Sequence, residues 1–198
     1  MKLPLIYLAS QSPRRQQLLT QIGVSFELLL PADTEAAEAL EAELPSEMPL
    51  AYVKRVTLLK LHAAQRLMQQ SKLEPRPVLC ADTTVALGDQ IFGKPRDRED
   101  AVRMLSALSA RTHDVFTAVA LHSTKRTGCI VQRSRVTFDK LSQADIAAYV
   151  DSGEPMGKAG AYAIQGQAAM FIKRILGSHS GIMGLPVFET SRLLKRLA

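Results

Sequence analysis

Two consecutive hairpin signals in the middle of the chain constrain the fold more than any other feature of the sequence. The segment 78–87 is apolar at both ends, and the Gly88-Asp89-Gln90 that follows it is typical of a tight turn. Residues 113–122 and 129–138 are predicted to pair around Gly128 as a second hairpin. Neighbouring antiparallel strands of this kind argue against a regularly alternating, doubly wound sheet.

Helix signals lie on both sides of these hairpins. Residues 5–9 are typical of a short buried strand, and Ser12-Pro13 then supplies an N-cap and a first-turn proline for a helix ending near Gly23. Apolar residues at helical spacing predict a second helix over 46–70. The other predicted elements are helices at 97–107, at 142–151 and from Pro186, and strand-like segments at 161–165 and 170–175. The pattern predicts an α/β (mixed α+β) protein with a mixed sheet.

The charge balance points to an anionic partner. The chain has 25 Lys and Arg against 19 Asp and Glu, a formal charge of +6, which favours polyanions through long-range attraction. Nucleic acid and nucleotides both qualify. Aromatic residues make up only 5% of the chain, Trp is absent, and the basic residues are spread along the sequence, which disfavours stable nucleic-acid binding. A small anionic ligand in a basic cleft accounts for the charge equally well.

Cysteine usage and hydropathy point to a cytoplasmic protein. Cys80 and Cys129 lie in apolar runs without paired spacing, as expected for reduced thiols. Pro4 interrupts the short apolar run at the N-terminus, which is too short for a signal peptide. Because no apolar stretch approaches the roughly 20 residues of a membrane span, we expect a soluble chain with no membrane partner.

The first polar constellation is Ser10-x-Ser12-Pro13-Arg14-Arg15, at the predicted start of a helix. Two arginines beside the positive end of a helix dipole are locally unfavourable, so an anion should compensate them. Free backbone amides, hydroxyls and planar guanidinium groups together suit phosphate oxygens. An ordinary capped surface helix, with its arginines turned away, is an equally good interpretation of these residues alone.

The second constellation, Ala81-Asp82-Thr83-Thr84, puts a carboxylate and two hydroxyls within an apolar strand. A buried aspartate needs partners, and backbone amides would satisfy it as well as a catalytic role would explain it. Lys60 on the long helix and Lys94 after the first hairpin are candidates for the same cleft, although Lys94 is also a plausible solvated lysine. The four histidines show no metal-ligand spacing and are interpreted as structural: His62, His113, His122 and His179.

Together with later segments, these residues resemble the Maf family of nucleotide pyrophosphatases. The family motifs occur in order as S-x-S-P-R-R at 10–15, A-D-T at 81–83, K-P-R-D at 94–97, K-A-G-A-Y-x-I-Q-G at 158–166, and Gly177-Ser178 with Gly184-Leu185-Pro186. Any one motif is weak, but five in register are specific and cover essentially the whole chain. The resemblance implies a single domain over 1–198. Its curved mixed sheet, with flanking helices in two lobes, would resemble the inosine triphosphate pyrophosphatases, and the family is usually dimeric.

The resemblance also implies an activity, the hydrolysis of dTTP and UTP between the α and β phosphates to the monophosphate and pyrophosphate. Asp82 matches the family's general base. The positions that match phosphate-binding residues are Ser10, Arg15, Lys60 and Lys94. Glu35 and Asp82 match carboxylates near a divalent metal, for which Mg²⁺ or Mn²⁺ suits better than zinc.

Base selection in the resembling family follows three positions, which here are Arg14, Thr83 and Gln165, the set associated with thymine and uracil. A carboxamide such as Gln165 can donate to a carbonyl and accept from an imide N–H of these bases. The alternatives are the sister branch, which acts on methylated GTP, and a non-enzymatic regulator of cell division or nucleic-acid binder. The chain departs from the usual family pattern at five positions: Gln11, Cys80, Gly93, Gly157 and Ala163. Gly93 matters most, because glutamate is common there.

Overall fold

The computed structural model describes residues 4–31, 39–123 and 126–197. Within these ranges seven strands form one sheet in the order β2-β1-β3-β5-β6-β7, and β4 also pairs with β3. The strands are β1 (Ile6–Leu8), β2 (Phe26–Leu28), β3 (Val78–Leu87), β4 (Gln90–Phe92), β5 (Thr112–His122), β6 (Thr127–Phe138) and β7 (Ile172–Leu176). β1 pairs in parallel with β2 and β3, and every other pairing is antiparallel. The prediction of a mixed sheet is therefore confirmed.

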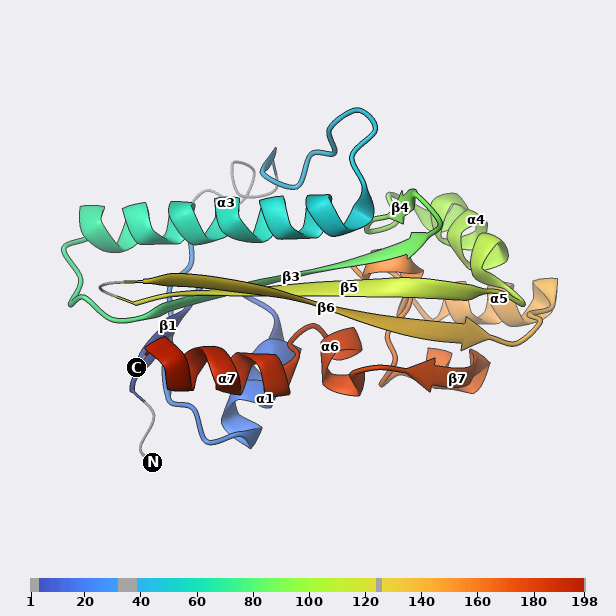
Figure 1. The fold of residues 1–198 in the computed structure, drawn as a ribbon. Coiled ribbons are helices and arrows are strands. Elements are labelled where there is room, and N and C mark those ends of the chain that lie inside the picture. Colours follow the sequence, from blue (N-terminus) through green and yellow to red (C-terminus); the bar gives the residue numbers. More distant parts are fainter. Residues whose placement is uncertain (1–3, 32–38, 124–125, 198) are drawn as a thin grey trace.

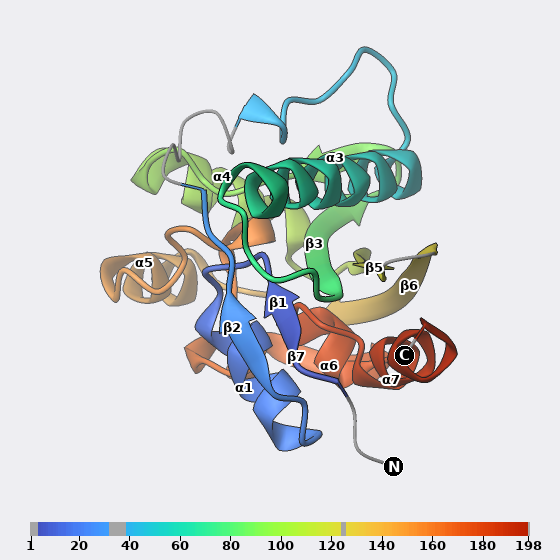
Figure 2. The same ribbon diagram turned by 90° about the vertical axis from the view of Figure 1, so that its left-hand side faces the viewer.

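Helices cover both faces of this sheet (Figure 1). They are α1 (Pro13–Gln21), α3 (Pro49–Gln70), α4 (Arg98–Leu108), α5 (Gln143–Asp151), α6 (His179–Met183) and α7 (Val187–Leu197), with 3-10 turns η1 (Ala159–Ala161) and η2 (Gln167–Phe171). The long helix α3 lies along one face, and α1, α6 and α7 lie on the other. Figure 2 shows α3 above β3, with α1 and α7 on the opposite side.

Strand β3 lies at the centre of the sheet and contributes to the core on both of its faces, because successive side chains of a strand point to opposite sides. Cys80 and Ala86 pack with residues of α3. Leu79 packs with α1 and α7, and Val85 packs with α4. A run of apolar residues with few polar interruptions is what burial on both faces requires.

One edge of β3 is interrupted at the level of Asp82. β5 pairs with β3 continuously from Val78 to Ala86 on the other edge. On the interrupted edge, β1 pairs as far as Leu79 and β4 begins at Val85. In the described part of the chain, residues 80–84 therefore have no strand neighbour on that side. Side chains of both sheet faces can meet at such a gap.

Two main apolar cores lie toward opposite ends of the sheet, on either side of this gap. One combines β1 and α1 with α7, and its fully buried residues include Ile6, Leu19 and Leu185. The other combines α4, α5 and η1 with Val115 near the start of β5 and with Val136 and Phe138 at the end of β6. Figure 1 shows α4 and α5 at one end of the sheet and β1, α1 and α7 toward the other. This arrangement agrees with the expected two lobes.

Local capping signals were reliable guides to two helices. The Asp97 side chain accepts from the Asp100 amide at the start of α4, as predicted. Ser142 and Asp145 form a reciprocal capping box at the start of α5. The predicted start of α3 was three residues early, because Ser46 has a φ of 57° and the helix begins at Pro49.

The predicted strand at 161–165 is wrong. Gly160 and Ala161 both have positive φ, 69° and 60°, a left-handed conformation that cannot continue a strand. These residues close the turn η1 instead. The predicted strand at 170–175 is displaced, because η2 occupies residues 167–171 and β7 begins at Ile172. The short strand β2 and the five-residue helix α6 carry no periodic signal and were not predicted.

Candidate active site

A cleft of about 1020 Å³ opens at the gap in β3. Its walls come from the start of α1, the sheet-facing side of α3, residues 81–85 of β3 and the turn 157–165. All eight described candidates line it: Ser10, Arg14, Arg15, Lys60, Asp82, Thr83, Lys94 and Gln165. The ninth, Glu35, lies outside the described residues. Convergence of residues so far apart in sequence on one cleft is the geometry expected of a binding site.

Arg15 is turned into the cleft. Its Nε donates to the carbonyl oxygen of Gly184 at 2.8 Å, and its Nη1 donates to Ser10 Oγ at 3.0 Å. Ser10 Oγ also accepts from the Ser12 amide at 3.2 Å, so the serine orders the loop before the helix. Burial lowers the pKa of Arg15, and the negative charge of Asp82 partly opposes that effect. This arrangement does not agree with an ordinary surface helix whose arginines point away.

Arg14 also lines the cleft, and its Nε is buried. Within the described ranges this nitrogen has no hydrogen-bond partner. Burial lowers the pKa of Arg14. An unpaired buried donor is unfavourable, and the described residues supply no hydrogen bond that would offset this cost.

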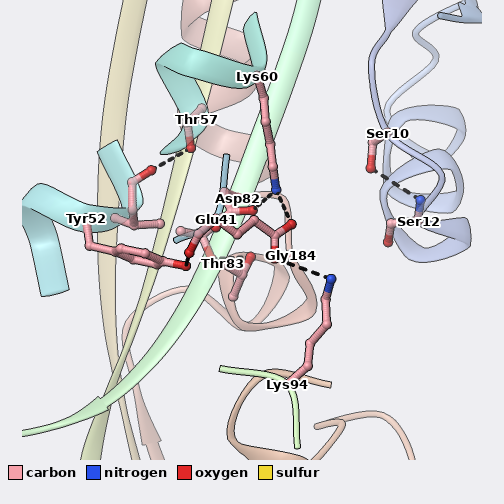
Figure 3. Close-up of polar contacts among 12 residues, drawn as sticks. Ser10, Ser12, Glu41, Tyr52, Thr57, Lys60, Asp82, Thr83, Lys94 and Gly184 are labelled. Carbon is pink, nitrogen blue, oxygen red and sulfur yellow. Dashed lines mark hydrogen bonds and ion pairs between the residues drawn. The ribbon is translucent and has the colours of Figure 1, made fainter. Parts of the chain in front are cut away.

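Lys60 joins two carboxylates at the centre of the cleft (Figure 3). Its Nζ donates to Asp82 Oδ1 at 2.6 Å and to Glu41 Oε1 at 2.7 Å. Lys94 Nζ lies 3.3 Å from the other oxygen of Glu41. Burial lowers the pKa of Lys60, but the charges of Asp82 and Glu41 raise it more, so the net shift is upward. Lys60 and Lys94 thus both contact Glu41 in the cleft. Of the two interpretations of Lys94, a cleft residue or a solvated lysine, this position agrees with the first.

Glu41 is a cleft residue that the sequence analysis missed. Tyr52 OH donates to the Glu41 carbonyl oxygen at 2.8 Å, which holds this segment against the start of α3. Burial raises the pKa of Glu41, but Lys60 and Lys94 lower it more, so the net shift is downward. No signal in the sequence singled it out, since glutamates recur at 35, 38, 41, 43 and 47.

Gln165 lies in the turn between η1 and η2, exposed at the cleft. The Glu154 carboxylate holds this turn, because it accepts from Tyr149 OH and from the Gln167 amide, both at 2.9 Å. A Cβ at Gly166 would collide with that carboxylate. A side chain at position 166 would therefore displace the Glu154 carboxylate from these hydrogen bonds.

Gly93 also lines the cleft. A Cβ at this position would meet no described atom within 4 Å. A β-carbon is therefore tolerated at this position, and compared with the glutamate that the family resemblance implies, the cleft wall has one carboxylate fewer.

Comparison with known proteins shows the family to which the chain belongs. A family model described as "Maf-like protein" matches residues 5–197. The chain belongs to the Maf family.

Relatives within this family are similar over nearly the whole chain. A dTTP/UTP pyrophosphatase of Albidiferax ferrireducens is 60% identical over 96% of this chain and 95% of its own. A dTTP/UTP pyrophosphatase of Polaromonas is 57% identical over 96% of this chain and 94% of its own. Among solved structures, the Staphylococcus aureus Ham1 protein aligns over 97% of this chain and 98% of its own, with 11% identity and a TM-score of 0.49.

Proposed function

We propose that this Maf-family chain hydrolyses nucleoside triphosphates, preferentially dTTP and UTP, to the nucleoside monophosphate and pyrophosphate. The observation that carries the proposal is the position of Asp82, a carboxylate in the same cleft as Arg15, Lys60 and Lys94. Two relatives at 57–60% identity bear the name dTTP/UTP pyrophosphatase.

The cationic groups suit a triphosphate. Arg15 comes from α1, Lys60 from α3 and Lys94 from the segment after β4, so the charges surround a ligand instead of lining one wall. Reactions at phosphorus depend mainly on positioning and charge neutralisation. The arginine provides a planar donor fork, and the lysines provide mobile point charges.

Asp82 is proposed as the general base. Its carboxylate would take a proton from a water molecule, whose oxygen attacks the α-phosphorus as the bond to the bridging α–β oxygen breaks. The electron pair of that bond leaves with the pyrophosphate. The hydrogen bond from Lys60 to Oδ1 orients the carboxylate and leaves Oδ2 for the water. A positioned base of this kind contributes about 10²–10⁴-fold to rate.

A divalent metal is expected from the family, and the donor set fits it. Asp82 and Glu41 both bond to the same Lys60 nitrogen, so their carboxylates lie within reach of a common ion. Within the described ranges no group of three or more His, Cys, Asp or Glu side chains is placed to hold a metal ion. Phosphate oxygens and water would complete the shell, as Mg²⁺ and Mn²⁺ prefer. When bound, the ion would neutralise charge on the triphosphate. We therefore propose Glu41 beside Asp82 as a ligand, whereas Glu35 remains an untested candidate.

The base would lie toward Arg14, Thr83 and Gln165. Thymine and uracil present an imide N–H between two carbonyl groups, which a carboxamide can meet with both its donor and its acceptor. The guanidinium group of Arg14, a residue that lines the cleft, would provide further donors. A methylated guanine carries a positive charge that Arg14 would repel.

The assembly and location of the protein remain proposals. None of the helices in the described part of the chain has the length and apolarity for a bilayer crossing. Cys80 and Cys129 are both free thiols, which supports a reducing, cytoplasmic location. A homodimer is expected from the family resemblance, and sedimentation analysis would measure it.

The decisive experiment is a panel of dTTP, UTP, ATP, GTP and 7-methyl-GTP, assayed for pyrophosphate and monophosphate with Mg²⁺, with Mn²⁺ and with chelator. We expect pyrophosphate from dTTP and UTP, at rates about 10²-fold above those of the purine nucleotides, and loss of activity with chelator. Faster hydrolysis of 7-methyl-GTP would move the chain to the sister branch. Release of orthophosphate alone would contradict cleavage at the α–β bond.

A further inference from the structure

A chain of hydroxyl groups runs from the cleft into the core of the sheet. Thr83 on β3 lies opposite Thr117 on β5. Their Oγ1 atoms are 3.0 Å apart, and Thr117 Oγ1 lies 2.7 Å from the carbonyl oxygen of Gly181 in α6. Thr83 lines the cleft, whereas Thr117 is 0% exposed. Thr117 therefore has no access to solvent and does not reach the cleft.

The direction of the protons in this chain follows from the chemistry of its last member. A carbonyl oxygen only accepts hydrogen bonds, and a threonine hydroxyl has a single proton. The Thr117 proton is therefore directed to Gly181, and the Thr117 oxygen is free only to accept. Thr83 must donate its own proton to Thr117. The Thr83 oxygen then offers the cleft only lone pairs.

The surroundings of Gly181 hold its carbonyl oxygen in position to accept from Thr117. Its carbonyl oxygen also accepts from the Gly184 amide at 2.9 Å, which closes the turn after α6. Gly184 lies beside Thr83 at the cleft, since a Cβ there would be 3.7 Å from Thr83 Oγ1 and 3.6 Å from Arg15 Nε. The absence of a side chain at Gly184 leaves the Thr83 oxygen accessible to a ligand.

We propose that Thr117 is a positioning residue that holds Thr83 as a pure hydrogen-bond acceptor and so selects pyrimidines whose N3 carries a proton. The inference rests on the proposed function, and it extends base selection to a preference for uracil and thymine over cytosine. Uracil and thymine donate from N3–H and match this acceptor. Cytosine has an unprotonated N3, so two lone pairs would face each other. A site built for one hydrogen-bonding edge rejects the mismatched one.

The test compares kcat/KM for UTP and CTP at one Mg²⁺ concentration, in the wild type, Thr117→Val and Thr117→Ser. Valine keeps the shape and removes the acceptor, which frees the Thr83 proton to turn toward the cleft. We expect the wild type to favour UTP by at least about tenfold, the scale of one hydrogen bond. The UTP/CTP ratio should fall at least about fivefold in Thr117→Val, and Thr117→Ser should restore it.

Thr112→Val is the matched control, because Thr112 and Thr137 form a similar hydroxyl pair at 2.8 Å on β5 and β6, outside the residues that line the cleft. It should leave the ratio unchanged. Thermal melting checks that each variant is folded. If Thr117→Val does not fold, Thr117→Ala takes its place in the comparison.

An unchanged ratio in a folded Thr117→Val or Thr117→Ala variant overturns the proposal, as does a Thr117→Ser variant that behaves like valine. A wild type that hydrolyses CTP within twofold of UTP overturns it without any variant, while the pyrophosphatase function stands. If the wild type releases no pyrophosphate from UTP or dTTP, the proposed function itself fails, and the inference falls with it.

Discussion

Lys60 Nζ donates a 2.6 Å hydrogen bond to Asp82 Oδ1, which connects the middle of α3 to the interrupted edge of β3. The same nitrogen also binds Glu41, and Glu41 in turn lies next to Lys94. Two carboxylates and two ammonium groups thus alternate across the cleft (Figure 3). Because the pKa of Lys60 is raised in this setting, with the attraction of Asp82 and Glu41 exceeding the effect of burial, the lysine stays charged through neutral pH.

Replacing Asp82 with Asn should lower turnover about 10²-fold or more, because the amide cannot take a proton from water. The fold should be preserved, since Lys60 retains Glu41 as its partner. Steady-state kinetics with dTTP and thermal melting measure the two effects. Asp89→Asn, in the exposed β3–β4 turn, is the matched control and should have normal turnover. Near-normal turnover in Asp82→Asn would remove Asp82 from this role.

Replacing Glu41 with Gln should raise the Mg²⁺ concentration needed for half-maximal activity and lower turnover, by about tenfold or more for the loss of one charged ligand. The comparison uses Glu43→Gln, an exposed neighbour, and Glu35→Gln. Magnesium titrations of the three variants separate the candidates. A raised requirement in Glu35→Gln with a normal one in Glu41→Gln would assign the ligand to Glu35 instead.

Replacing Arg15 with Ala should weaken binding of the nucleotide in the transition state by roughly 1.5–3 kcal/mol, the scale of a charge-assisted hydrogen bond. The loss should be seen in kcat/KM for dTTP. Arg174→Ala on the exposed strand β7 removes the same charge away from the cleft and should have little effect. Unchanged kinetic constants in Arg15→Ala would show that Arg15, although it lines the cleft, does not bind the nucleotide.

Replacing Gln165 with Glu should erode the preference for dTTP and UTP over purine triphosphates, because a carboxylate can only accept hydrogen bonds. The ratio of kcat/KM for dTTP to that for GTP measures this preference. Gln143→Glu, at the exposed start of α5, introduces the same charge elsewhere and should keep the wild-type ratio. If Gln165→Glu also keeps it, Gln165 does not select the base.

Acid should destabilise the protein in part through His113. This residue is 2% exposed, and its Nε2 lies 2.9 Å from Tyr162 OH. Burial lowers the pKa of His113 from 6.5 to about 4, and the negative charge of Asp114 opposes this effect. As the pH falls, His113 takes up a proton near pH 6.5 in the unfolded chain but only near pH 4 in the folded chain. The free energy of unfolding therefore decreases as the pH falls between these values.

At pH 4.5 the loss attributable to His113 is about 2–3 kcal/mol relative to pH 7.5. Urea unfolding at the two pH values measures it in the wild type and in His113→Gln. Glutamine does not titrate but can still bond to Tyr162, so the variant should lose less stability on acidification by about this amount. Equal losses in the two proteins would show that His113 does not carry the effect.

The sequence by itself determined the elements whose signals act over a few residues. The hairpin turn at 88–90 and the caps at Asp97 and Ser142 were predicted and are observed. Such signals are reliable because they depend on hydrogen bonds between residues close in the chain. The family motifs likewise identified Asp82 and its neighbours as candidates. The described ones line one cleft, and their roles stay predictions that the experiments above would test.

Only the tertiary structure decided which distant groups meet. Glu41 reaches Lys94 across 53 positions of the chain, and Thr117 reaches Gly181 across 64. The turn at 159–161 has left-handed residues where the apolar pattern predicted a strand. These features depend on where β1 and β4 stop along β3, because that gap lets side chains from both sheet faces converge. Local periodicity contains no information about such a gap, since it is set by the register between strands.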